Sequence, residues 1–264
     1  MRAHHRTLTR LAWGTVLAYR ADFVLQLLGV AVQTVAVIAV WRVVTAGGTG
    51  SAAGLTWDQL KAYLLIAFAT GTLMSGFTDW QLAERVLSGN VALELVKPVD
   101  YQLARFAEAL GYVAGEVVVV LAMGTVLLVA FGGVPVPGGA QAVLFLISLL
   151  AVIPLKFGLI YLSGMACFWT ESYYGVGVAR VAVTNILSGA LVPIALYPDW
   201  LQALCRLSPF PGIVSTPALV FLGEVGVAEA VRLIAWQFVW IAVLWLGART
   251  VWRLAVTRFS AHGG

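Results

Sequence analysis

The sequence predicts an all-α membrane protein with six transmembrane helices. Hydrophobic residues make up 61% of its 264 residues and charged residues only 11%, which is far more apolar than a soluble domain. The mean hydropathy is +0.93. The apolar residues are grouped in runs, and a run of about 20 residues lets a helix cross a hydrocarbon core ~30 Å thick. Polar or glycine-rich segments separate the runs, so a single membrane domain accounts for the chain.

A basic amphipathic segment precedes the first apolar run. Within residues 1–22 the apolar side chains of Leu8, Leu11, Trp13 and Leu17 alternate with four arginines: Arg2, Arg6, Arg10 and Arg20. This pattern is typical of a helix that lies in the membrane interface. We therefore expect residues 1–22 to form an interfacial helix and residues 23–264 to form one six-span domain. No cleavable signal pattern is apparent at the N-terminus.

The six predicted spans follow from the apolar runs. The breaks between them contain glycine, proline or charged residues, which end or interrupt membrane helices. The predicted spans are 23–44, 60–78, 110–131, 142–169, 181–197 and 231–251.

The polar segment between the second and third spans, residues 79–100, is called the elbow. Apolar residues recur in it at steps of three and four, which predicts a short amphipathic helix over residues 80–88. Gly89 supplies a left-handed stop, Pro98 breaks helical geometry, and Asp100 is placed to cap the next helix. A polar elbow fixed between two spans suits a surface on which another protein pushes. An ordinary solvated loop is the alternative.

The 33 residues between the fifth and sixth spans, residues 198–230, are apolar but interrupted. Their apolar pieces are too short to cross a membrane, and four prolines break them: Pro198, Pro209, Pro211 and Pro217. Two short, partly embedded helices fit this pattern, provided that protein covers their free backbone groups. A structured outer loop fits the pattern equally well.

The distribution of Lys and Arg predicts the orientation. With the N-terminus inside, eleven basic residues lie in inner regions: Arg2, Arg6, Arg10, Arg20, Arg85, Lys97, Arg105, Arg180, Arg249, Arg253 and Arg258. Four lie in outer regions: Arg42, Lys61, Arg206 and Arg232. Cytoplasmic loops are the ones enriched in basic residues. Both termini and the elbow are therefore expected in the cytoplasm. The net charge of +4 reflects these topology signals and does not indicate nucleic-acid binding.

The sequence contains no recognisable catalytic or cofactor motif. The glycine-rich segment at 47–54 lacks the Gly-Lys-Ser/Thr ending of a phosphate-binding loop. The histidines His4, His5 and His262 are terminal, so no metal site is expected, and no Ser, His and carboxylate set lies within the spans. Cys167 and Cys205 fall in different segments, and no disulfide is expected. The chain is therefore not expected to be an enzyme.

Two charged residues, Glu116 and Lys156, fall within predicted spans. They lie equally far from the outer turn that joins the third and fourth spans, so an antiparallel helix pair brings them to similar depth. Buried charges in lipid are costly and mark a structural pair or a substrate pathway. Both roles stay open, as does the absence of any contact. On the last span, Trp236 and Trp240 are candidates for an aromatic cavity, although packing or lipid-facing tryptophans are the commoner case.

Several segments resemble one family. They occur in the order YRADF at 19–23, DWQLAERVLSGNVALELVKPVD at 79–100, FWTES at 168–172, LSGALVPIALYPDWLQALCRLSPFPG at 187–212 and TPA at 216–218. Together they resemble the six-span permease subunits of bacterial ABC exporters of the ABC-2 family, with the type V fold. More narrowly, they resemble the viologen-exporter-like branch. The resemblance extends over almost the whole chain.

This resemblance implies that the elbow contains a coupling helix seated on an ABC ATPase. The expected coupling residues are Trp80, Leu82, Glu84, Arg85, Leu87, Lys97 and Asp100. Glu84 and Arg85 are the main candidates for polar contacts. The resemblance also implies two partly embedded outer helices within residues 198–223. ATP and magnesium would bind only to the ATPase dimer, so this chain would hold no cofactor. A second, similar but distinct permease is the expected partner, and a homodimer is the alternative.

The predicted function is the permease subunit of an ATP-driven exporter in the bacterial cytoplasmic membrane. Its substrate would be an amphiphilic small molecule or a drug-like compound, as in multidrug efflux. An ion-coupled secondary carrier is the main alternative, based on Glu116 and Lys156. A non-transporting scaffold, in which the elbow is a docking site without turnover, is a third possibility.

Overall fold

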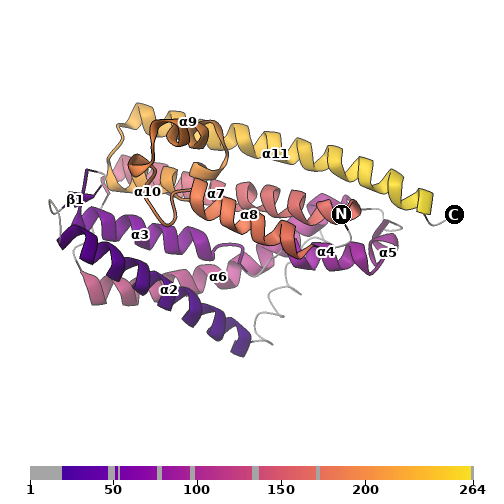
Figure 1. Cartoon of the computed structure of the whole chain (residues 1–264), viewed down its shortest axis with the longest axis horizontal. Coiled ribbons are helices and arrows are strands. Elements are labelled where there is room, and N and C mark those ends of the chain that lie inside the picture. The colour runs from indigo at the N-terminus through magenta and orange to yellow at the C-terminus, as the bar shows by residue number, and fades with distance from the viewer. Residues whose placement is uncertain are drawn as a thin grey trace.

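The protein is a bundle of helices, seen here in a computed structural model (Figure 1). The structure describes residues 20–46, 51–52, 54–75, 79–95, 99–132, 137–170 and 173–262. The long helices are α2 (Arg20–Ala46), α6 (Tyr101–Phe131), α7 (Gly139–Met165) and α11 (Val227–His262). The shorter helices are α3 (Trp57–Thr72), α4 (Asp79–Leu87), α5 (Val91–Leu95), α8 (Tyr174–Leu187), α9 (Asp199–Leu207) and α10 (Ser215–Leu222).

Short elements join these helices. Strands β1 (Ser51–Ala52) and β2 (Leu55–Thr56) pair antiparallel in a small hairpin before α3. Three 3₁₀ turns follow later in the chain: η1 (Ala166–Phe168), η2 (Ile194–Leu196) and η3 (Phe210–Gly212). The predicted all-α class therefore agrees with the described structure. The interfacial helix predicted for residues 1–22 lies almost entirely outside the described residues.

Helix α7 forms the centre of the bundle. It packs along α11 on one side and contacts α4, α10 and α6 on the others (Figure 1). At Gly158 the approach is so close that an added Cβ would lie 2.7 Å from Cβ of Leu244 on α11. Ser148 of α7 donates a hydrogen bond to Gln237 of α11 at 2.9 Å. The fully buried side chains of α7 include Leu155, Phe157 and Tyr161.

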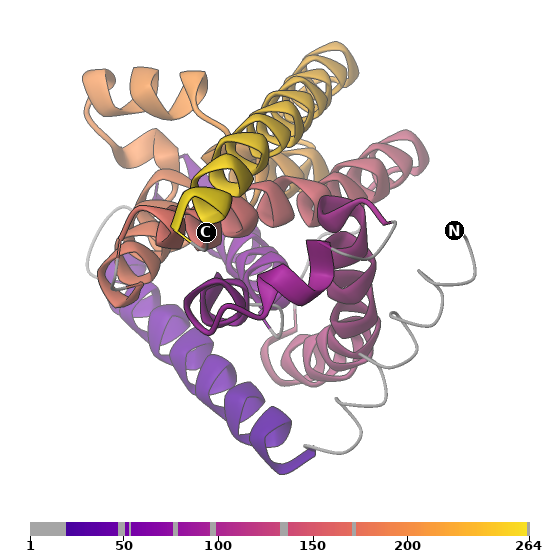
Figure 2. The same ribbon diagram turned by 90° about the vertical axis from the view of Figure 1, so that its right-hand side faces the viewer.

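Two hydrophobic clusters meet along α7. One surrounds Phe157, Tyr161 and Met165 and takes in α4 and the first turns of α6. The other surrounds Val152 and Leu155 and takes in α3 and α10. The elbow helices α4 and α5 lie at the end of the bundle that also carries the C-terminus (Figures 1 and 2). The molecule therefore has an elbow end and an opposite end that contains β1, β2 and α10.

Three helices in the described part of the chain are long and apolar enough to cross a membrane: Tyr101–Val126, Gly139–Phe168 and Val227–Val256. Two shorter apolar helices, Val32–Thr45 and Tyr174–Leu187, accompany them. This composition fits a multi-pass membrane protein. Helix α2 also contains the predicted first span.

Two predicted spans end earlier than expected. The second was predicted to reach residue 78, but α3 ends at Thr72. The fifth was predicted over residues 181–197, but α8 covers Tyr174–Leu187. The chain turns there because Gly189 has a φ of +81° and its carbonyl accepts a hydrogen bond from the buried Tyr63 hydroxyl at 2.9 Å. Apolar residues continue beyond Leu187, so hydropathy alone did not reveal this turn.

The interrupted region after α8 contains two short helices, as expected. Helices α9 and α10 are nine and eight residues long, which is too short to cross a hydrocarbon core ~30 Å thick. Ser215 at the start of α10 donates its backbone N–H to the carbonyl of Ser188 at 3.2 Å. This contact joins the region to the end of α8.

Candidate functional site

The elbow helix α4 forms where the sequence predicted it, and it is fixed to the bundle on one face. Leu82 and Ala83 are fully buried and Val86 nearly so. Leu82 packs directly onto Gly164 of α7, where an added Cβ would lie 2.7 Å from Cβ of Leu82. Gly89 ends the helix region with a φ of +73°, a conformation that glycine adopts without strain. Leu82 therefore belongs to the buried face of α4 and lies away from the surface.

The opposite face of α4 is exposed. Trp80 is 54% exposed and Leu87 is 48% exposed, and Glu84 between them is also exposed. Their spacing of four and three residues aligns them on one side of the helix. We call Trp80, Glu84 and Leu87 the elbow stripe. An exposed tryptophan and leucine beside a carboxylate, on a rigidly held helix, suit a protein contact.

Arg85 is bound within the chain. Its guanidinium donates to both carboxylate oxygens of Glu108 on α6, at 3.0 and 2.6 Å. Arg105 of α6 pairs with the same Glu108 at 2.7 Å and with Glu94 of α5 at 3.2 Å. Burial lowers the pKa of Arg85, but the charges of Glu108 and Glu94 outweigh it and raise the pKa above its ordinary value. These four residues, the elbow ion network, join α4 and α5 to α6.

A second ion pair ties the start of α4 to α8. Arg180 of α8 donates to both carboxylate oxygens of Asp79, and the Ser163 hydroxyl of α7 donates to Asp79 at 2.9 Å. Burial raises the pKa of Asp79, but the hydrogen bonds from Arg180 and Ser163 and the positive charge of Arg180 hold the pKa below its usual value. Helix α4 is thus bound to α6, α7 and α8 together.

The helical structure is interrupted between α3 and α4, at a segment that both Lys156 and Glu116 contact. After Thr72 the helix stops, and Met74 takes a φ of +63°, which is unusual for a residue other than glycine. Lys156 of α7 donates to the carbonyls of Thr70, Gly71 and Leu73 at this end of α3. These are among the carbonyls that a helix end leaves without intrahelical partners.

Glu116 of α6 holds the other side of the same interruption. Its carboxylate accepts the backbone N–H of Met74 at 2.5 Å and the hydroxyl of Ser75 at 2.9 Å. Glu116 is only 1% exposed. The two charges that the sequence predicted at similar depth therefore both bind residues 70–75, which we call the break.

The remaining predicted coupling residues have separate positions. Asp100 caps α6 as expected, since its carboxylate accepts the N–H of Leu103 at 2.9 Å, and it lies 3.5 Å from Arg249 of α11. Lys97 lies outside the described residues. The arginines of the ion pairs at this end, Arg85, Arg105, Arg180 and Arg249, are all among those assigned to one side of the membrane from the sequence.

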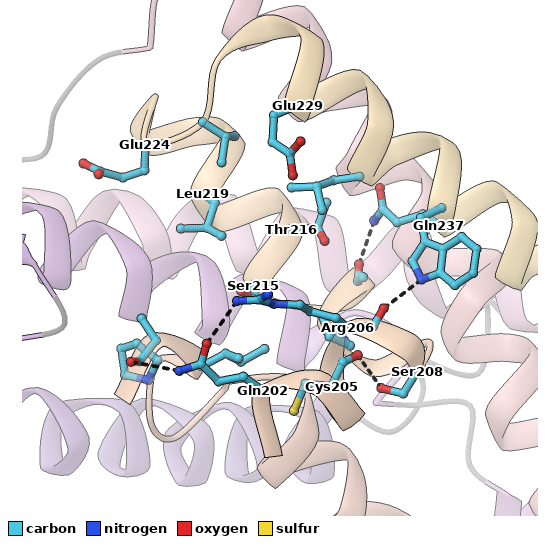
Figure 3. Close-up of a pocket in the computed structure, with 18 of the residues that line it drawn as sticks. Gln202, Cys205, Arg206, Ser208, Ser215, Thr216, Leu219, Glu224, Glu229 and Gln237 are labelled. Atoms are coloured by element: carbon cyan, nitrogen blue, oxygen red, sulfur yellow. Dashed lines mark hydrogen bonds between the residues drawn. The ribbon is translucent and has the colours of Figure 1, made fainter. Parts of the chain in front are cut away.

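Trp236 and Trp240 lie in the wall of a cavity of about 920 Å³ near α9, α10 and the first turns of α11 (Figure 3). Their rings are 6.2 Å apart and nearly perpendicular, at 85°. The indole of Trp236 donates to the carbonyl of Arg206 at 3.1 Å. In the part of the chain that is described, no group of three or more His, Cys, Asp or Glu side chains is arranged to hold a metal ion.

Sequence reasoning missed Asp79, Glu108 and Arg180 as structural partners of the elbow. Asp79 and Arg180 are 101 residues apart, and no local pattern connects them. The i,i+3 spacing of Arg105 and Glu108 could have indicated one pair in the network. The close contact of Gly164 with Leu82 left no signal beyond a glycine in an apolar helix.

The comparison with protein families gives one match. A family model described as "ABC-2 family transporter protein" matches residues 30–263, which includes all the helices from α3 to α11 and the part of α2 from residue 30 onward. No curated protein matches the chain.

Proposed function

The chain belongs to the ABC-2 family of transporter proteins, and from this premise we propose that it is the permease subunit of an ATP-driven exporter. Members of this family are membrane subunits of ABC transporters and normally do not catalyse ATP hydrolysis themselves. The observation that carries the proposal is the elbow stripe on a helix bound to three core helices. ATP and magnesium would be held by separate ATPase subunits.

The elbow stripe is the surface on which we propose that the ATPase acts. Trp80 and Leu87 offer apolar area, and Glu84 offers a charged contact at the centre. Hot spots of protein interfaces are enriched in tryptophan surrounded by polar contacts. Arg85 supports this surface from within the chain through Glu108, so its proposed role is to position α4.

Movement of α4 would reach the bundle by two routes. The elbow ion network and the Asp79–Arg180 pair connect α4 to α6 and α8 directly. The break connects it to α3 through residues that Lys156 and Glu116 hold. Because α7 contacts both α4 and α11, a displacement of α4 acts on the core of the bundle. We propose that this displacement switches a cavity between two permeases from inward- to outward-facing.

The assembly proposed here contains two permeases and an ATPase dimer. The second permease is proposed as a similar but distinct chain, with a homodimer as the alternative. The six-span topology is part of the proposal, with α2, α3, α6, α7, α8 and α11 as the spans and both termini in the bacterial cytoplasm. At ~1.5 Å per residue, α8 is only about 21 Å long, so its crossing would need the residues that follow it.

The proposed substrate is an amphiphilic small molecule or drug-like compound, as in the viologen-exporter-like branch. The rival function, an ion-coupled carrier, depends on Glu116 and Lys156 as ion-binding groups. Both side chains bind backbone or hydroxyl groups of the break, which supports a structural role for them and weakens the rival.

The test separates the two functions. The chain purified alone and reconstituted should show neither ATPase activity nor proton-driven uptake. Copurified with its ATPase, it should support ATP-dependent uptake of ethidium, an amphiphilic dye, into inverted vesicles. Uptake driven by a proton gradient in the isolated chain would instead establish the carrier.

A further inference from the structure

The cavity beside α9 and α10 has no part in the path from the elbow through the bundle. It lies toward the end of the molecule opposite the elbow, and α9, α10, α11 and the intervening loops all contribute to its wall (Figures 1 and 3). Its volume of about 920 Å³ is in the range of pockets that hold drug-sized ligands, roughly 300–1,000 Å³. The wall is partly apolar, through Leu219, Leu233 and Trp236.

Four charged side chains line the cavity, and three of them have strong partners. Arg232 pairs with Glu229 at 2.6 Å, and Glu224 accepts a hydrogen bond from the amide of Gln59. Arg206 is different. Its guanidinium donates only to the neutral side-chain oxygen of Gln202, at 3.1 Å, and no carboxylate in the described residues pairs with it. Figure 3 shows Arg206 bonded to Gln202 and set apart from Glu224 and Glu229.

A second residue of the cavity wall has a donor without a partner. The indole nitrogen of Trp240 is buried and makes no hydrogen bond to any of the described residues, although Trp240 lines the cavity. A buried N–H group without an acceptor is unfavourable. Arginine and indole are donors only, so the free polar groups of this cavity call for an acceptor, and the positive charge of Arg206 favours an anionic one.

The covering helix α9 has its apolar side outward. Trp200 and Leu207 are each 70% exposed and Leu204 is 49% exposed, at spacings of four and three residues. On the other side of α9, Gln202 and Arg206 line the cavity. An amphipathic helix with aromatic and leucine side chains on its free face is suited to the membrane interface. The cavity thus lies beneath a helix whose free face is suited to the boundary between lipid head groups and acyl chains.

We propose that this cavity binds the anionic head group of an amphiphile, a phosphate or a carboxylate, with its hydrocarbon portion against Leu219, Leu233 and Trp236. Arg206 is the main head-group ligand, because a guanidinium binds phosphate and carboxylate through paired hydrogen bonds. Trp240 donates a further hydrogen bond. The amphiphile is either a phospholipid from the leaflet next to α9 or a soluble single-chain compound.

This site goes beyond the proposed exporter function and does not depend on it. Binding requires neither ATP nor an ATPase, so a failure of one proposal leaves the other standing. A cationic amphiphile fits this cavity less well. Its two carboxylates, Glu229 and Glu224, are already bound by Arg232 and Gln59, whereas the charged group without an ion-pair partner is the guanidinium of Arg206.

The experiment uses the full chain, with any subunits that copurify, in dodecyl maltoside. Native mass spectrometry measures the binding of phosphatidylglycerol, phosphatidylcholine and dodecyl phosphate, and inorganic phosphate is tested as a competitor. The variants are Arg206→Gln, Arg206→Lys and Trp240→Phe. Arg42→Gln is the matched control, because Arg42 is an exposed arginine of α2 that does not line the cavity. Thermal melting confirms that each variant is folded.

We expect the wild type and Arg42→Gln to bind an anionic amphiphile equally, and Arg206→Gln to bind it about tenfold more weakly, the loss of one charge-assisted contact. Arg206→Lys should lie between them, and Trp240→Phe should lose about threefold, as for a neutral hydrogen bond. Retention of phosphatidylglycerol identifies a membrane lipid, and retention of dodecyl phosphate alone identifies a soluble amphiphile. Equal binding by Arg206→Gln and Arg42→Gln, equal binding of phosphatidylcholine, or full displacement by inorganic phosphate would overturn the proposal.

Discussion

Lys156 and Glu116 hold opposite sides of one break in the chain, the first through carbonyls at the end of α3 and the second through the N–H of Met74. Helix ends in a membrane leave backbone groups without water to bind, and each unsatisfied group is costly. Here a cationic side chain satisfies the acceptors and an anionic one satisfies a donor. The two charges therefore allow a helix to stop inside an apolar bundle.

The break should be the most sensitive part of the bundle to loss of charge. Lys156→Met removes the donors of three carbonyls, and we expect it to lower the free energy of unfolding by about 3 kcal/mol. Glu116→Gln should cost less, because an amide oxygen still accepts the N–H of Met74. The double variant should lose less than the sum of the two, because both side chains act on one turn. Thermal melting in detergent measures the changes.

A matched control for the break is Thr125→Val on α6. Among the described residues, the Thr125 hydroxyl bonds to the carbonyl of Leu121 in its own helix, so little change is expected. Strictly additive losses for Lys156→Met and Glu116→Gln would show that the two side chains act independently, contrary to this interpretation.

The elbow stripe should govern assembly without affecting folding. Trp80→Ala combined with Glu84→Arg should weaken ATPase binding, measured by copurification, by about thirtyfold, because an aromatic anchor of an interface contributes roughly 2 kcal/mol. The melting temperature should stay the same, because both side chains are exposed. Trp200→Ala, which removes another exposed tryptophan, from α9, is the control. If the ATPase copurified with the double variant as well as with the wild type, the elbow stripe would not be the surface that binds the ATPase.

Glu108 should affect the coupling of ATP hydrolysis to transport by stabilising the elbow ion network. Glu108→Gln leaves Arg85 and Arg105 without their shared carboxylate, at a cost on the order of 2 kcal/mol. The ATPase should still copurify because the stripe is intact, but ATP-dependent uptake of ethidium should fall. Glu229→Gln removes an exposed i,i+3 pair with Arg232 and should hardly change the melting temperature. Wild-type melting and transport in Glu108→Gln would mean that the network does not fix the elbow.

The Asp79–Arg180 pair should make stability depend on pH. The pKa of Asp79 is lowered in the folded state. The contribution of Asp79 to the free energy of unfolding is therefore complete above the unfolded pKa of about 3.9. It is lost as the pH falls through the folded pKa. Asp79→Asn should therefore melt below the wild type at neutral pH, and the difference should shrink in strong acid. Asp199→Asn, on the exposed side of α9, is the matched control. If the difference in melting temperature between the wild type and Asp79→Asn grew in acid, the pKa of Asp79 would not be lowered in the folded state.

Gly164 should be required for the seating of α4. In Gly164→Ala the new methyl group meets Cβ of Leu82 and the backbone of Asp79, so α4 must move, at a cost of about 1–3 kcal/mol. We expect lower melting temperature and weaker coupling of ATP hydrolysis to transport. Gly175→Ala is the control, because an added Cβ there meets nothing within 4 Å. Equal melting of the two variants would show that the contact is loose.

The local features of the elbow could be predicted from the sequence. Helix α4 was expected over residues 80–88 and is found at Asp79–Leu87, because helical periodicity and the stop at Gly89 are properties of neighbouring residues. The cap at Asp100 was predicted for the same reason. The exposed face of α4 was predicted less accurately than the helix itself. Leu82 was placed among the coupling residues, but it packs on Gly164.

The ends of α3 and α8 show where sequence reasoning failed. Hydropathy continues past Thr72 and past Leu187, but α3 ends where Lys156 and Glu116 satisfy its free groups. Helix α8 ends where Gly189 takes a positive φ beneath the Tyr63 hydroxyl, which an added Cβ would approach within 2.5 Å. Each stop depends on a residue from another helix.

The sequence by itself determined the all-α membrane class, the amphipathic elbow and the presence of two charges in apolar helices, because composition and short-range periodicity encode them. Only the tertiary structure decided what those charges bind, which face of the elbow is exposed, and that Arg206 and Trp240 share one cavity. These features join residues from distant parts of the chain, and their pairing is set by how the helices pack.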